Sequence, residues 1–236
     1  MRVSRMMVAG VAGAAVLSLA GVARAQVKDS AHDLTAESWQ VEGSRTLCGP
    51  CHTPHNAGDQ DGNQLIPLWN HMTDKDSTFT PYTSDSLDAS VGDPTGPSLA
   101  CLSCHDGAIA IDSYGKDLVS GLMITGTHYM TDPDRSPLAN LGTDLSNDHP
   151  ISFDYDAAHA LDGYLRASDT EITDVPAFAG KTIGEALLKG GKMECTSCHD
   201  PHRQKGTNGE NPSSLFLVID GPGYDGSMLC LECHIK

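Results

Sequence analysis

The chain has 236 residues, of which 39% are hydrophobic, 5% aromatic and 19% charged, and its formal net charge is −16. This acidic balance excludes a nucleic-acid-binding protein, because phosphate affinity requires patches of Lys and Arg, and it disfavours binding to anionic membranes. With so few aromatic residues, and with 24 Gly and 13 Pro, the side chains offer little material for a packed core, and something else is expected to fill the interior.

The N-terminal segment, residues 1–25, has the features of a secretory signal peptide. Arg2 and Arg5 precede an apolar run at residues 8–22, and a small-residue cleavage pattern follows at residues 23–25. The run is shorter than the roughly 20 residues that a membrane-spanning helix needs, so an uncleaved anchor is the weaker alternative. We expect an exported protein, extracellular or at the cell surface, or alternatively in the periplasm, without membrane insertion.

Regular secondary structure is expected to be sparse. Residues 58–63 and 73–97 are rich in Gly, Asp, Ser, Thr and Pro and predict loops. The longest predicted helix covers residues 181–189, where apolar residues recur at helical spacing before two glycines. Shorter helices are predicted at residues 99–105, 155–160 and 193–199.

All eight cysteines fall in four copies of one motif, Cys-x-x-Cys-His. Two thiols at this spacing can bond the two vinyl groups of one haem, and the adjacent histidine then reaches the iron, so the motif is typical of c-type haem attachment. The sequence therefore predicts four covalently attached haem c groups. The cysteines of the thioether bonds are Cys48, Cys51, Cys101, Cys104, Cys195, Cys198, Cys230 and Cys233. The iron ligands within the motifs, called proximal here, are His52, His105, His199 and His234.

Three other uses of cysteine explain the pattern less well. Disulfides are common in exported proteins, and paired cysteines also build zinc sites, but neither use explains a histidine after every pair. The first motif, Cys48–Cys51, also matches a thioredoxin-type redox site. That site is followed by a helix, which Pro54 would interrupt almost at once.

The remaining histidines are candidates for the second axial ligand of each iron, called distal here. Seven histidines remain of eleven, so all four haems can have two histidine ligands. His55 and His202 each follow a proximal histidine by three residues, which is too close to reach the far face of the same haem, so each is expected to ligate a different haem. His71, beside Trp69, and His149 complete the predicted set. No role is assigned to His32, His128 and His159.

A haem with both axial positions filled has no site for a substrate and passes electrons. We therefore expect an electron-transfer protein and no enzyme, since a reductase would need an open haem. The expected fold is mostly irregular coil with short α-helices, wrapped around a stack of four haems, with little β-structure. Residues 26–236 would form one domain with two di-haem units, at about 48–105 and 195–234, and a connecting segment at 106–194.

With these motifs in place, the sequence resembles the multihaem c-type cytochromes with doubled CxxCH motifs. Within them it is most similar to the OmcE-type tetrahaem cytochromes of the bacterial outer surface. The resemblance is spread over nearly all of residues 26–236. The matching stretches are Cys48–Asn56, Pro67–His71, Cys101–Gly107, Leu141–Phe153, Glu194–His202 and Cys230–His234.

This resemblance implies that the chain polymerises with itself, head to tail, into a filament (nanowire) for extracellular electron transfer. It implies that His55 ligates a haem of the adjacent subunit, as the second histidine of the first motif does in such filaments. Redox partner proteins or extracellular acceptors would exchange electrons with the filament. The alternative is a discrete, soluble periplasmic tetrahaem carrier, and the sequence leaves open whether four distal histidines are available within one chain.

Overall fold

A computed structural model describes residues 27–37, 46–52, 68–73, 78–114, 125–202, 217–219 and 227–235. The predicted signal peptide at residues 1–25, the predicted loop at residues 58–63 and the candidate ligand His55 lie outside the described residues.

Regular elements are few and short in the described part of the chain, as predicted. The longest helix has 10 residues, and the two strands, of two residues each, pair antiparallel with Phe153 opposite Met193. The α-helices are α1 (Gly96–His105), α2 (Tyr155–His159), α3 (Ile183–Ala186), α4 (Cys195–Cys198) and α5 (Met228–Cys233). The strands are β1 (Phe153–Asp154) and β2 (Lys192–Met193), and the 3₁₀ turns are η1 (Leu34–Ala36), η2 (Pro137–Ala139) and η3 (Pro176–Phe178).

Helix α1 confirms the helix predicted at residues 99–105 but begins three residues earlier. Pro97 stands in its first turn, where the missing backbone N–H costs no hydrogen bond and the fixed φ suits a helix. The prediction of a loop through residue 97 was therefore wrong at its end, because a proline that usually punctuates loops opens this helix.

Helix α3 is shorter than the helix predicted at residues 181–189. Its start is readable from the sequence, since Thr182 and Glu185 form a reciprocal capping box. After Ala186 the chain forms a turn. In it the Lys189 N–H donates to the Lys192 carbonyl at 3.0 Å, and the Lys192 N–H donates to the Lys189 carbonyl at 3.2 Å. Gly190 and Gly191 close this turn with φ of +61° and +81°, which favours glycine, and the turn delivers the chain into β2.

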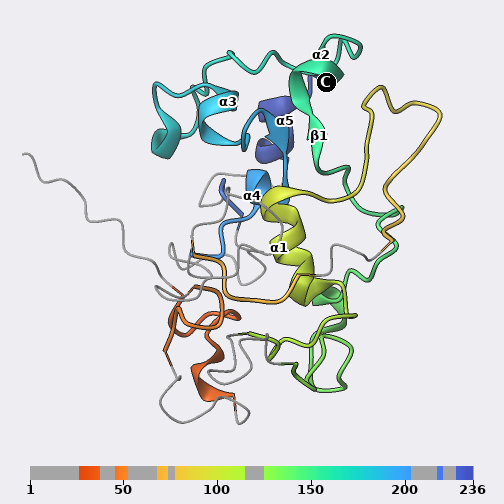
Figure 1. Cartoon of the computed structure of the whole chain (residues 1–236). Helices are drawn as coiled ribbons and strands as arrows, with labels where there is room; N and C mark the ends of the chain where they lie inside the picture. Colours follow the sequence, from red (N-terminus) through yellow and green to blue (C-terminus); the bar gives the residue numbers. More distant parts are fainter. Residues whose placement is uncertain are drawn as a thin grey trace, which may run out of the picture.

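The side-chain core is concentrated at the end of the molecule that holds α2, α3 and α5 (Figure 1). Its most buried members include Tyr155, Ile172 and Ile183, each with an exposed fraction of 0%. In the described part of the chain, a second and smaller cluster lies beside α1, with the buried residues Phe79, Leu102 and Leu145. None of the helices in the described ranges has the length and apolar character needed to cross a membrane.

Candidate functional site

The four CxxCH motifs follow one another through the molecule. Figure 1 shows the N-terminal segment at one end, α1 and α4 in the middle, and α5 at the other end. The second motif ends α1, the third forms α4, and the fourth forms α5. Helices α1 and α4 pack together, and the Cys101 and Cys195 thiols form a hydrogen bond there. The second and third motifs, 90 residues apart in sequence, are therefore neighbours.

Six of the eight cysteines are at least partly buried, and Cys48 and Cys230 are exposed. None of the eight is in a disulfide. Burial raises the pKa of Cys51 and of Cys104 to about 12, and that of Cys198 to about 11. A redox dithiol needs an accessible thiolate at neutral pH, which the raised pKa values of these three thiols do not favour. Among the described residues, no group of three or more His, Cys, Asp or Glu side chains is arranged to hold a metal ion by itself.

Three proximal histidines each face a histidine from another part of the chain. The ring centres are 6.1 Å apart for His52 and His202. They are 6.1 Å apart for His32 and His105, and 6.3 Å apart for His149 and His234. Metal–imidazole bonds are about 2 Å long, so two rings that share one metal have centres roughly 6 Å apart.

Ordinary ring packing also allows centre separations of about 4.5–7 Å. The rings of His52 and Trp69 also lie 6.0 Å apart, so the separation by itself does not indicate a metal; what distinguishes the three histidine pairs is that each unites one motif histidine with one histidine from elsewhere. The angle between ring planes ranges from 16° to 84° among the three pairs, so the pairs share a separation without sharing a stacking geometry. A common separation at varied angles fits two rings placed on either side of a metal.

Several of these histidines make a polar contact through Nδ1. The Nδ1 atoms of His105 and His149 lie 2.6 Å and 2.8 Å from the carbonyl oxygens of Ala139 and Pro150. His202 Nδ1 lies 3.4 Å from the Asp200 carboxylate. A ring that donates from Nδ1 keeps its lone pair on Nε2, which is how metal-ligating histidines are oriented in proteins.

His32 is the site residue that the sequence analysis did not select. Burial, followed by the neighbouring His105 and His202, lowers its pKa to about 4, so the ring is neutral at pH 7. The one hint in the sequence was that seven histidines outside the motifs are available for four distal positions. His32 is 73 positions before its facing residue His105, and no local motif marks it.

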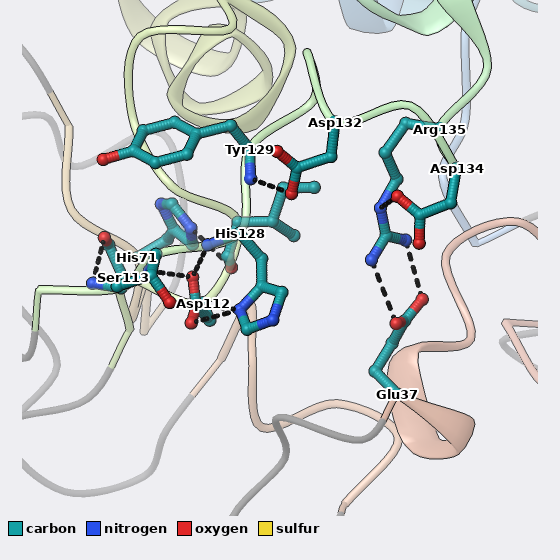
Figure 2. A network of polar contacts seen from close by, with 12 residues as sticks. Glu37, His71, Asp112, Ser113, His128, Tyr129, Asp132, Asp134 and Arg135 are labelled. Carbon is teal, nitrogen blue, oxygen red and sulfur yellow. Dashed lines mark hydrogen bonds and ion pairs between the residues drawn. The ribbon is translucent and has the colours of Figure 1, made fainter.

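An ion pair joins the segment that carries His32 to the segment whose Ala139 carbonyl contacts the His105 ring. Figure 2 shows Arg135 bonded through two nitrogens to the Glu37 carboxylate, at 2.7 and 3.0 Å. Glu37 ends the turn that follows His32, and Arg135 precedes Ala139, whose carbonyl holds the His105 ring. Bidentate pairing fixes both distance and direction, so this ion pair holds the two segments together beside the facing rings of His32 and His105.

The other predicted distal ligands have different surroundings. His149 and His202 face His234 and His52, as described above. His71 is 3% exposed, and its Nε2 lies 3.4 Å from the Cys104 thiol and 3.0 Å from the Ile111 carbonyl oxygen. Burial lowers the His71 pKa. His71 thus reaches the second motif at its cysteine.

Two further histidines make local contacts. His128 Nδ1 bonds to the Asp112 carboxylate at 2.9 Å, as Figure 2 shows, and His159 Nδ1 donates to the Leu165 carbonyl at 3.0 Å.

The facing pairs include the proximal histidines of the first, second and fourth motifs. The third motif's proximal histidine, His199, is in none of these pairs. Of the four predicted distal ligands, His71 and His55 are not used by the three pairs and are the candidates for it.

Comparison with known proteins identifies no family for this chain. No protein-family model matches the chain, and no curated protein matches it.

Proposed function

We propose that this chain is a c-type cytochrome that carries four covalently bound haems, transfers electrons and is not an enzyme. The observation that best supports this proposal is the set of three facing histidine pairs, each with one member from a CxxCH motif. The donor set fits haem: paired cysteines for the two thioether bonds, and two neutral imidazoles for the iron.

The chain's own residues would hold, orient and close each site. When bound, haem supplies an iron that is oxidised and reduced by one electron. The Cys pairs fix the position of each group, and the backbone carbonyls of Ala139 and Pro150 orient two of the ring ligands. Since a histidine faces the motif histidine in three sites, both axial positions would be filled there, and no position would be left for a substrate.

The haem content tests this function directly. Produced with the c-type haem attachment machinery, the full chain is expected to carry four haems, measured by intact mass and by haem assay. The matched double variant Cys230→Ser/Cys233→Ser is expected to carry three, because it removes one attachment site. Bound zinc in place of haem, or wild-type protein with fewer than four haems, would contradict the proposal.

We further propose that the protein assembles head to tail into an extracellular filament that conducts electrons. The placement of α5 and of residues 27–37 on opposite sides of α1 and α4 supports this (Figure 1). Large apolar side chains are exposed near the fourth motif, and one is exposed near the first. The one near the first motif is Leu68, 51% exposed, which precedes Trp69, the bridge partner of His52. Those near the fourth motif are Leu161, Tyr164, Leu231 and Ile235, with exposed fractions of 71%, 74%, 41% and 44%.

Contacts between two different ends of one chain propagate as an open helix wherever their rotation does not close into a ring. Electron cryomicroscopy of the native protein is therefore expected to show helical filaments. The variant His55→Ala is expected to abolish them, because it removes the ligand proposed to reach the adjacent subunit, whereas His159→Ala is expected to leave them intact. Dispersed wild-type particles with four closed haems would instead favour the discrete periplasmic carrier.

A further inference from the structure

One buried carboxylate lies between the second and third motifs and has no part in the proposed haem attachment. Glu194 immediately precedes Cys195, at the start of α4, where α4 packs against α1 (Figure 1). Its exposed fraction is 1%. Charged side chains are almost never buried to this degree without a partner of opposite charge. Among the described residues, the ion pairs do not include Glu194.

Hydroxyl groups take the place of a cation around this carboxylate. One oxygen accepts hydrogen bonds from Ser98 Oγ, which is itself fully buried, and from Ser152 Oγ at 2.9 Å. The other oxygen accepts from Thr95 Oγ1 at 3.3 Å. Hydrogen bonds donated to a carboxylate stabilise its ionised form. Lys192 is the nearest cation in this network, and its Nζ reaches Thr95 Oγ1, at 3.4 Å, instead of the carboxylate.

The charge of Glu194 acts on the attachment cysteines of both motifs. The pKa of Cys101 is raised, first by its hydrogen bond with Cys195 and by burial, and the negative charge of Glu194 adds to the rise. The pKa of Cys195 is lowered by the same thiol–thiol bond, and Glu194 opposes that lowering. One carboxylate is therefore within electrostatic range of both the second and the third attachment sites.

We propose that Glu194 is a fixed, buried negative charge that lowers the reduction potentials of the two haems attached at the second and third motifs. The inference rests on the proposed function. Taking up one electron converts a ferric iron to a ferrous iron and removes one positive charge, so a nearby anion favours the oxidised form. Burial keeps this effect from being screened by salt. The two middle haems are then harder to reduce than they would be without Glu194.

The variant Glu194→Gln tests this inference, because it removes the charge and keeps the size and an acceptor oxygen. In a spectroscopic titration of the four-haem protein with dithionite, we expect two of the four midpoint potentials to rise. Each of these two midpoint potentials is expected to rise by roughly 59 mV. For a one-electron couple this corresponds to about a tenfold increase in the ratio of reduced to oxidised haem at a given potential. The other two potentials are expected to stay unchanged.

The matched control is Glu185→Gln, which removes one exposed charge and retains the capping box, since Gln also serves at that position. We expect it to leave all four potentials at their wild-type values. Unchanged potentials in Glu194→Gln, or an equal shift in Glu185→Gln, would overturn the inference. A wild-type protein without four haems would instead overturn the proposed function.

A second variant tests the inference even where Glu194→Gln does not fold. Thr95 is exposed, so Thr95→Val is expected to fold and to keep the carboxylate while removing one hydroxyl donor. Without the Thr95 hydroxyl dipole, the negative charge of Glu194 is less compensated. The same two potentials are therefore expected to fall, by less than they rise in Glu194→Gln. Potentials that stay unchanged or rise in Thr95→Val would contradict a charge effect of Glu194.

Discussion

Without haem, this chain is expected to lose its cooperative unfolding transition. Within the described ranges, the cluster beside α1 contains three buried apolar residues, and the α-helices have between 4 and 10 residues. Isolated helices of this length are unstable in water, and a small domain has only about 5–15 kcal/mol of net stability to lose. Folding and haem attachment should therefore be inseparable, as they are for structural metal sites.

The measurement is thermal and urea unfolding, followed by circular dichroism, of protein made with and without the haem attachment machinery. Amide hydrogen exchange adds a regional test. In the haem-free chain, exchange is expected to be fastest at residues 78–114, and slower at residues 153–193, where most of the larger core lies. A haem-free chain with a sharp transition and uniform protection would show that the side chains alone specify the fold.

The local elements could be predicted because their signals lie within a few residues. Asp154 caps α2 by accepting from the Ala157 N–H at 2.8 Å, and such a side chain before a helical stretch is visible in the sequence. The capping box of Thr182 and Glu185 marks the start of α3 in the same way. The end of α3 could not be predicted, because the β-pairing of Met193 with Phe153, 40 positions away, sets the path of the chain there.

Histidine pairing was only partly predictable for a similar reason. The three-residue spacing from His199 argued that His202 serves another haem, and the structure places it opposite His52. Spacing could not say which haem, since that depends on contacts between distant segments. His32 shows the limit most clearly, because its contact with His105 joins positions 73 residues apart, beside an ion pair of Glu37 with Arg135 that also joins distant positions. Neither residue has a recognisable motif around it.

Removing one facing histidine is expected to open one haem out of four. His32→Ala takes away the ring opposite His105, and His149→Ala takes away the ring opposite His234. Each variant is expected to convert one low-spin, six-coordinate iron into a high-spin, five-coordinate iron, because no ring remains on the distal side. Carbon monoxide should then bind to the reduced protein at one haem per chain, measured by its optical absorption, while the wild type binds essentially none.

The control for these variants is His159→Ala, whose half-buried ring bonds to a backbone carbonyl and is in none of the three pairs. It removes a histidine that is half-buried like His32, whereas His149 is exposed, and it is expected to leave every iron low-spin and closed to carbon monoxide. Carbon monoxide binding in His159→Ala, or its absence in His32→Ala, would mean that the ring separations near 6 Å reflect side-chain packing. A response confined to the paired residues would identify His32 as an iron ligand, because loss of a merely structural ring would not open one coordination site.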